Sequence, residues 1–255
     1  MMLLDDLKRI AQMKNLPLRN AEKDYMLDIC LFALSRQRSV LAFKGGTALY
    51  KFHNLNRFSE DLDFTLNKKR FALDKICSGI ISTYGYLGIN AQIAEPKRFK
   101  NEVNIAINLR GPLFDGSRET LCRTAINISL RERPVHVETK LYIPAYTELQ
   151  SFELQLIGID ELLAEKVRAI MTRDKPRDVY DAWFLLRKGT KPDLLLINKK
   201  LKIYAMKFNK DDFFEHIENK RKAWKKDLQG LMIGTLPGFD IISDEIRTRL
   251  NEMVL

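Results

Sequence analysis

A glycine pair followed by two alternating aspartates constrains this chain more than any other feature. Gly45 and Gly46 open a segment that reads as a helix, and Asp61 and Asp63 stand on the next predicted strand. Alternate residues of a strand point to one face, about 6.6–6.8 Å apart, so both carboxylates can serve one site. Leu62, between them, is apolar and is expected to face the core, which places both acids on the opposite face.

This pattern suits a phosphate-binding turn beside a divalent cation. Glycines let backbone N–H groups approach a phosphate closely, and the N-terminus of a helix favours anions. Paired carboxylates supply the hard oxygen ligands that Mg²⁺ prefers when it carries a nucleoside triphosphate. Ser59 shares the face of the acids, so its hydroxyl either binds a phosphate or caps the strand. The simpler alternative is a surface strand with two solvated acids after a Gly-Gly loop.

The sequence around these residues resembles the sequences of the nucleotidyltransferase superfamily that includes polymerase beta. The segments KGGTALYKF (44–52) and RFSEDLDF (57–64) are closer to one branch, the AbiEii-type toxins of type IV toxin–antitoxin systems. A second block is also similar, with an A-x-K-x-x-A helix core at 164–169 and a P-R-D-x-x-D helix start at 176–181. The two blocks occur in the same order as in the family, and the resemblance covers roughly residues 40–187.

The resemblance implies an α+β fold: a polymerase-beta-like nucleotidyltransferase core with a mixed sheet flanked by helices, plus a helical C-terminal region. We expect a core with N-terminal helices over 1–155 and a helical domain over 156–255. The implied activity is Mg²⁺-dependent transfer of a nucleotide from an NTP to an acceptor hydroxyl, with the tRNA 3′ end as the expected acceptor. The family also implies growth inhibition and a cognate antitoxin protein.

The same resemblance assigns roles to individual residues. Asp61 and Asp63 are the expected metal ligands and catalytic acids, joined by Lys166 and Asp181 as catalytic residues. Asp181 is expected to orient either the lysine or the nucleotide. The expected nucleotide-binding residues are Lys44, Gly45, Gly46, Ser59 and Arg177. Judged without the family, Lys166 would be an ordinary solvated lysine.

One departure concerns a third carboxylate, which polymerase-beta-like enzymes commonly carry on a later strand. The best counterpart strand, at 123–130, offers the neutral Asn127 instead. Glu132 or Glu138 is a possible substitute nearby. If neither acts as a substitute, three possibilities remain: the metal alone activates the acceptor hydroxyl, Asp181 serves as the base, or the activity is weak.

Charge and composition bear on partners and compartment. The net charge of +10 points to a polyanionic partner such as RNA. Residues 196–226 carry ten Lys or Arg against four acids, so we expect them to form part of an RNA-binding surface, a solvated face being the alternative. The scattered cysteines Cys30, Cys77 and Cys122 predict buried free thiols in a reducing cytoplasm. No segment resembles a secretory signal or a membrane span.

The sequence is also compatible with two functions other than nucleotide transfer to tRNA. The acceptor hydroxyl can belong to a protein or a small molecule. Alternatively, the fold is catalytically weak and binds RNA or a partner, a hypothesis that rests on Asn127.

Apolar periodicity predicts the remaining elements. Helices are expected at 3–14, 20–37, 47–53, 71–84 and 160–172, followed by a helix starting at Pro176 and a helical segment from about 194. Strands are expected at 40–43, 61–66, 89–93, 103–109, 124–131 and 134–142.

Overall fold

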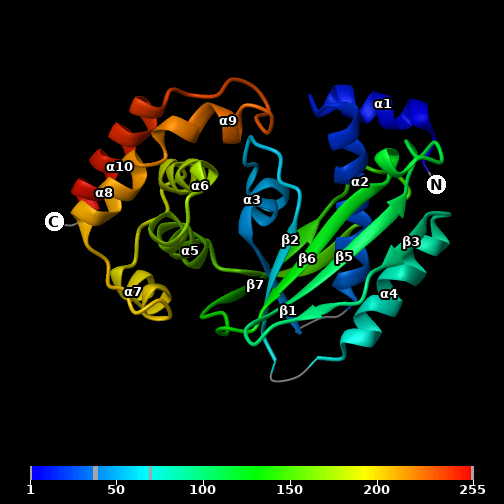
Figure 1. Cartoon of the computed structure of the whole chain (residues 1–255), viewed down its shortest axis with the longest axis horizontal. Helices are drawn as coiled ribbons and strands as arrows, with labels where there is room; N and C mark the ends of the chain where they lie inside the picture. The colour runs from blue at the N-terminus through cyan, green and yellow to red at the C-terminus, as the bar shows by residue number, and fades with distance from the viewer. Residues whose placement is uncertain (1, 37–39, 69–70, 254–255) are drawn as a thin grey trace. The chain divides into compact units, whose positions relative to one another are not determined.

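The computed structural model describes residues 2–36, 40–68 and 71–253 (Figure 1). The chain forms two compact units. Unit 1 contains residues 1–54 and 58–157, and unit 2 contains residues 158–255 together with the short segment Leu55–Arg57. This short segment lies within the sequence of unit 1 but packs with unit 2.

Unit 1 is built on a mixed sheet with the strand order β3-β5-β6-β2-β1-β8-β7, and β4 pairs with β5 outside this path. The strands are β1 (Leu41–Lys44), β2 (Leu62–Leu66), β3 (Asn90–Ile93), β4 (Lys97–Arg98), β5 (Glu102–Arg110), β6 (Cys122–Ser129), β7 (Val137–Tyr142) and β8 (Phe152–Ile157). Central β2 pairs antiparallel with β1 and parallel with β6. The structure therefore confirms the α+β class with a mixed sheet flanked by helices.

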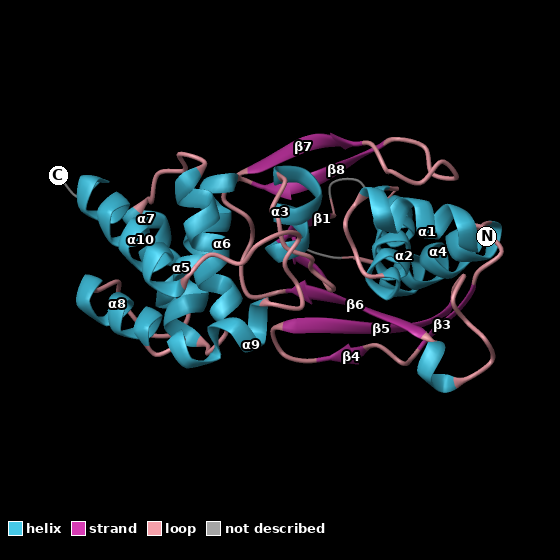
Figure 2. Ribbon diagram, turned by 90° about the horizontal axis from the view of Figure 1, so that it is seen from above, coloured by secondary structure: helices cyan, strands magenta, loops and turns pink. Residues whose placement is uncertain are grey.

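Helices α2 and α4 pack against each other and contact strands of the sheet, as Figure 2 shows. The helices of unit 1 are α1 (Leu4–Met13), α2 (Leu18–Ser35), α3 (Gly45–His53) and α4 (Leu73–Tyr86), with a short 3-10 helix η1 at Arg118–Thr120. On β6, buried Thr124, Ile126 and Ile128 alternate with more accessible residues. This period of two buries one face of the strand and leaves the other polar.

A buried ionic cluster joins α3 to α2 in unit 1. The Lys51 ammonium contacts the carboxylates of Asp24 and Asp28, the latter at 2.6 Å, and all three side chains are at most 2% exposed. Tyr142 donates a hydrogen bond to Asp28 at 3.0 Å, and Lys14 approaches Asp24 at 2.5 Å. Because each charge has a close partner, the cluster can stay ionised away from water.

The pKa values of the two acids in this cluster diverge. Burial alone would raise the pKa of Asp24, but attraction to Lys51 and Lys14 outweighs it and lowers the pKa to about 2. Burial raises the pKa of Asp28, and Lys51 offsets this only in part. The pKa of Lys51 rises well above its usual range, because the two carboxylates outweigh the effect of its own burial. Lys51 therefore keeps its charge and holds α3 against α2.

Unit 2 is helical over the rest of its length. Its helices are α5 (Ile159–Thr172), α6 (Pro176–Arg187), α7 (Leu194–Lys202), α8 (Lys210–Glu218), α9 (Trp224–Leu228) and α10 (Phe239–Met253), with a 3-10 helix η2 at Arg221–Ala223. The segment Leu55–Arg57 is held by the backbone, since Ile233 donates its N–H to the carbonyl of Asn56 at 2.9 Å. Tyr180 on α6 donates its hydroxyl to the Asn56 side chain at 2.5 Å.

Two cations of the basic segment 196–226 are structural. Lys200 is 1% exposed and its ammonium lies 2.5 Å from the Glu161 carboxylate. Lys220 is 2% exposed and donates to the carbonyls of Ile170 and His216, where α5 and α8 end. Carbonyls at a helix C-terminus attract cations, which explains this placement. Lys200 and Lys220 are therefore not available to the RNA-binding surface expected of this segment.

Most predicted elements appear within two or three residues of their expected bounds. Residue 37, the expected end of the second helix, lies outside the described residues. The predictions omitted the two-residue β4 and also β8, although Phe152, Leu154 and Leu156 alternate with polar residues as a half-buried strand requires. This omission matters because β8 lies between β1 and β7.

Two expectations from composition can be compared with the structure. Cys30 and Cys122 are buried free thiols as predicted, whereas free Cys77 is only half-buried. Across residues 2–36, 40–68 and 71–253, no helix has both the length and the apolar character that crossing a membrane requires.

Candidate active site

The glycine turn and the Asp-x-Asp pair meet in unit 1. Lys44 ends β1 and faces Asp63 in the register of the two strands, and α3 begins at the next residue, Gly45. Gly45 has a φ of +78°, a left-handed conformation that favours glycine. A Cβ atom at this position would lie 2.5 Å from Asp63 Oδ2. Glycine is therefore required here on two counts, backbone conformation and the approach of the carboxylate.

The start of α3 has the features of an anion site. In the described part of the chain, no side chain caps this helix through a hydrogen bond. The first N–H groups of a helix lack partners within the helix and carry partial positive charge. Gly45 and Gly46 supply the first two of these groups, beside the Asp63 carboxylate. The turn can therefore receive a phosphate next to a cation held by the acids.

Thr47 connects this turn to the acidic strand. Its buried hydroxyl donates to the backbone carbonyl of Asp61 at 2.5 Å and lies 2.9 Å from Ser59 Oγ. Ser59 is thus bonded to the first turn of α3. Thr47 was not predicted as a site residue, although its place inside the KGGT motif was the available signal.

Asn127 lies on β6 beside Asp63, at the position where the family resemblance implies a third carboxylate. The parallel register of β2 and β6 pairs Asp63 with Asn127, and Asn127 Nδ2 donates to Asp63 Oδ1 at 3.1 Å. Asn127 therefore orients Asp63 as a neutral hydrogen-bond donor. Glu138 is on β7, three strands from β2, so the suggestion that it substitutes for the third acid is wrong. Glu132 accepts a hydrogen bond from Thr65 through its backbone carbonyl.

The donor set fits a divalent cation that is bound together with a substrate. Asp61 is exposed immediately before β2, and Asp63 is the second residue of that strand, half-buried. No cluster of three or more His, Cys, Asp or Glu residues suited to a metal occurs among the described residues. Mg²⁺ typically binds through one or two carboxylates, with substrate phosphates and water completing its shell. Two acids beside an open phosphate turn meet that requirement.

The second group of predicted residues forms a buried ionic network within unit 2. Lys166 on α5 places its ammonium 3.0 Å from Asp178 Oδ1 and 2.7 Å from Asp181 Oδ2, both on α6. Arg173 also binds Asp178, at 2.7 and 2.8 Å. Lys166 is 6% exposed and the two aspartates are fully buried. Lys166 is therefore not the solvated lysine that its sequence context alone suggested.

Arg57 completes this network. It is 2% exposed and binds Asp181 through two hydrogen bonds, from Nε at 2.7 Å and Nη2 at 2.6 Å. Burial alone would lower the pKa of Arg57, but the Asp181 carboxylate outweighs it and raises the pKa. Lys166 behaves in the same way, its pKa raised by Asp181 and Asp178 against its own desolvation. For Asp178, Lys166 and Arg173 outweigh burial and lower the pKa.

Arg57 is the first residue of the RFSEDLDF motif, but its sequence context alone indicated no role for it. It lies four residues before Asp61 in the chain, and its guanidinium belongs to the network of Lys166 and Asp181 in unit 2. Its bidentate partner is 124 residues away in the sequence, which is why spacing alone did not reveal the pair.

Arg177, a predicted nucleotide-binding residue, contacts a different acid. Its backbone N–H donates to Asp227 Oδ2 at 3.1 Å, and its guanidinium lies 3.9 Å from Asp227 Oδ1. The predicted residues thus form two groups, with Lys44, Gly45, Gly46, Ser59, Asp61 and Asp63 in unit 1 and Lys166, Asp181 and Arg177 in unit 2.

The glycine turn yields a first prediction. Gly45→Ala should unfold at a lower temperature and lose nearly all activity, because the new Cβ strains the left-handed backbone and displaces the Asp63 carboxylate. Gly79→Ala is the matched control. Gly79 lies inside α4, an added Cβ would meet nothing within 4 Å beyond its chain neighbours and the backbone of its own helix, and the variant should be about 0.5–1 kcal/mol more stable. Thermal unfolding of both variants tests this. A Gly45→Ala protein as stable as wild type would contradict the described turn.

Comparisons with known proteins identify the family of this chain. Residues 29–248 match the family model described as "Nucleotidyl transferase AbiEii toxin, Type IV TA system". A search of curated proteins gives no significant match.

Solved structures share the fold at low sequence identity. MenT4, a nucleotidyltransferase toxin from Mycobacterium tuberculosis H37Rv, is 19% identical with a TM-score of 0.65, over 100% of this chain and 90% of that one. JHP933 from Helicobacter pylori is 21% identical with a TM-score of 0.59, over 92% and 91% of the two chains.

Proposed function

This chain belongs to the AbiEii nucleotidyltransferase family of type IV toxin–antitoxin systems, and we propose that it transfers a nucleotide from an NTP to the 3′ hydroxyl of an RNA, with tRNA as the favoured acceptor. The observation that carries the proposal is the contact of the Asp63 carboxylate with the Gly45 turn. Membership of the family implies an NTP substrate and an antitoxin partner. NTPs and tRNA occur together in the cytoplasm, where we place the reaction.

The reaction joins the acceptor oxygen to the α-phosphorus and releases pyrophosphate. Catalysis of this kind depends on positioning and on neutralising the charge that develops on the phosphates. Gly45 and Gly46 would bind phosphate oxygens through their N–H groups, with Lys44 and Ser59 beside them. Thr47 fixes the backbone of Asp61 relative to this turn. Asn127 keeps Asp63 oriented by donating to one carboxylate oxygen.

We assign Mg²⁺ to Asp61 and Asp63. When bound there, it would neutralise phosphate charge and lower the pKa of the attacking hydroxyl. Because Asn127 is neutral, the described strand beside Asp63 offers no third carboxylate at that register position to act as a base. The two aspartates are therefore the chain's main electrostatic contribution to activating the acceptor.

We propose that Lys166 and Asp181 act mainly by positioning. Asp181 holds both the Lys166 ammonium and the Arg57 guanidinium, and the chain continues from Arg57 to Ser59 and Asp61. This favours the role in which Asp181 orients the lysine. Arg177 remains a proposed nucleotide contact, since its side chain is part-exposed and only 3.9 Å from a single carboxylate oxygen.

The C-terminal basic segment is proposed as part of the RNA surface, reduced to the cations that the structure leaves accessible. Lys222, Lys225 and Lys226 are exposed. Replacing all three with Glu should weaken tRNA binding and lower the slope of log affinity against log salt by at least about 2, because each phosphate contact contributes roughly 0.7 to 0.9. Binding measured across a salt series checks this. An unchanged slope would mean that these lysines form a solvated face.

The function itself is tested by incubating the protein with each labelled NTP and total tRNA, with and without a chelator. We expect label in the RNA with Mg²⁺, none with EDTA, and recovery when Mg²⁺ is returned in excess. Labelling that EDTA does not affect would contradict the assignment of a divalent cation to Asp61 and Asp63.

A further inference from the structure

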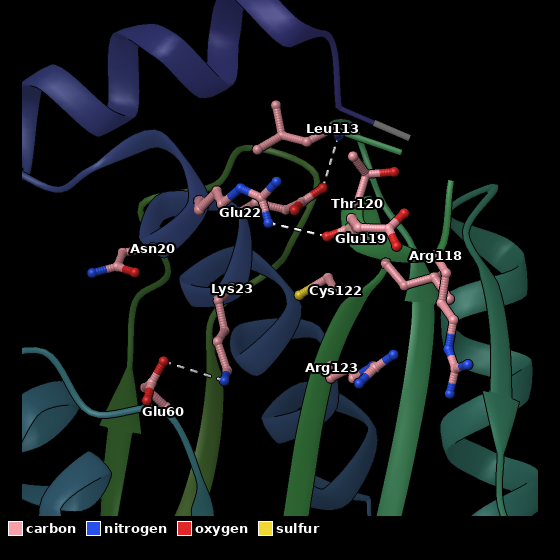
Figure 3. A pocket seen from close by; sticks show the side chains of 12 residues that line it. Asn20, Glu22, Lys23, Glu60, Leu113, Arg118, Glu119, Thr120, Cys122 and Arg123 are labelled. Carbon is pink, nitrogen blue, oxygen red and sulfur yellow. Dashed lines mark hydrogen bonds and ion pairs between the residues drawn. The ribbon is translucent and has the colours of Figure 1, made fainter. Parts of the chain in front are cut away.

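A pocket of about 700 Å³ lies in unit 1, outside the glycine turn. Its lining comes from three places: the first turns of α2, the segment around η1 and the start of β6 (Figure 3). Glu60, directly before Asp61 in the chain, also borders it. The pocket therefore adjoins the segment that carries the catalytic acids but has no role in the mechanism above.

The charges that remain available in this pocket are mainly positive. It is lined by the cations Arg19, Lys23, Arg118 and Arg123 and by the acids Glu22, Glu60 and Glu119. Glu22 is 4% exposed and accepts the N–H of Leu113 at 2.8 Å, so it faces inward. Glu60 lies 3.4 Å from the Lys23 ammonium, which offsets its charge. Arg19 interacts electrostatically with Glu22, which leaves Arg118 and Arg123 against Glu119.

Arg118 and Arg123 are the most available of these arginines. Both are exposed, and within the described part of the chain neither forms an ion pair or a side-chain hydrogen bond. Arg19 is partly engaged, since it donates to the Glu119 carbonyl at 3.1 Å. Guanidinium groups bind phosphates with two parallel hydrogen bonds, so arginines without partners suit a phosphate ligand.

The register of the sheet relates this pocket to the catalytic acids. Arg123, Ala125 and Asn127 alternate with buried residues of β6 and share one face of the strand. Asn127 is paired with Asp63, and Arg123 precedes it by four residues, about 13 Å at roughly 3.3 Å per residue. A stacked nucleic acid strand rises about 3.4 Å per nucleotide, so this distance corresponds to roughly four nucleotides.

We propose that the pocket around Arg118 and Arg123 binds backbone phosphates of the acceptor RNA about four nucleotides before its 3′ end. This inference rests on the proposed function, because it places the 3′ hydroxyl at Asp61 and Asp63. An extended anion suits the site better than a second NTP, since the cations are spread over three chain segments. The arginines would contact phosphates of the RNA backbone, so they favour RNA over other acceptors without selecting a base sequence.

The test measures binding of a labelled RNA stem with a four-nucleotide 3′ overhang, independently of transfer. The variant is Arg118→Gln with Arg123→Gln. The control is Arg36→Gln with Lys75→Gln, which removes the same charge from exposed positions at the end of α2 and on α4. We expect the pocket variant to bind roughly tenfold more weakly. Its salt slope should be lower by about 1.4, at about 0.7 per single-strand phosphate contact.

The outcomes separate this inference from the proposed function. Binding by the pocket variant equal to that of the control overturns the inference, even if the wild-type protein labels RNA. Weaker binding by the pocket variant alone supports it, even if no transfer is detected. A blunt stem without the overhang serves as a second probe, and we expect it to lose most of the difference between variant and control. An equal loss of affinity with the blunt stem would overturn the placement near the 3′ end.

Discussion

Replacing Asp63 with asparagine is expected to lower nucleotide transfer at least about a thousandfold while leaving the fold intact. The change removes one negative charge and almost no volume, and Asn at this position can still accept the hydrogen bond from Asn127. A single electrostatic contact in a catalytic site contributes about 10²–10³ in rate, and Asp63 is also a proposed metal ligand. The measurement is the initial rate of RNA labelling, with thermal unfolding as the check on folding.

Glu138→Gln is the matched control for this prediction. It also converts one carboxylate to an amide in unit 1, but on β7, where Glu138 pairs with Lys140 at 2.8 Å. This control should transfer nucleotides at the wild-type rate. If Asp63→Asn labelled RNA as fast as Glu138→Gln, Asp63 would have no part in the chemistry.

Replacing Lys51 with methionine is expected to reduce the free energy of unfolding by about 3–5 kcal/mol, the usual cost of removing one partner from a buried ion pair. Asp24 and Asp28 would then lie buried side by side with only Lys14 to offset them. Because Lys51 belongs to the helix that begins at Gly45, transfer should fall as well. Denaturant unfolding at neutral pH measures the loss.

Two further variants test the explanation for Lys51. Adding Asp28→Asn to Lys51→Met should recover part of the loss, since one of the uncompensated charges disappears. Lys75→Met on the exposed side of α4 should change the stability by no more than about 0.5 kcal/mol. A Lys51→Met protein that differs from Lys75→Met by less than 1 kcal/mol would mean that the cluster does not support α3.

The arrangement of the proposed metal ligands in unit 1 was predictable because it depends on local order. Gly45 and Gly46 define a helix start, and the alternation of Asp61 and Asp63 with apolar residues defines a strand with one polar face. The resemblance also picked out Asn127 at the position of the third carboxylate, and the register of β2 and β6 places it beside Asp63. The contact that makes Gly45 obligatory required coordinates, because it depends on how closely β2 approaches α3.

The ionic network of unit 2 was less predictable, because it includes a pair of charges that lie far apart in the chain. The family motif marked Lys166 and Asp181, but nothing in the local sequence indicated that they are buried or that Asp181 also binds Arg57. Lys200 shows a signal that could have been used. It lies three residues after Ile197 and four after Leu196, on the apolar stripe of α7, so its burial was readable from helical periodicity.

Parallel reactions with α-labelled and γ-labelled NTP show whether the protein joins the α-phosphate of an NTP to an RNA 3′ hydroxyl. We predict that RNA acquires label from the α position and none from the γ position, and that periodate oxidation of the RNA 3′ end beforehand abolishes the labelling. Label from the γ position, label on protein instead of RNA, or labelling that survives oxidation would mean that the protein does not transfer a nucleotide to an RNA 3′ hydroxyl.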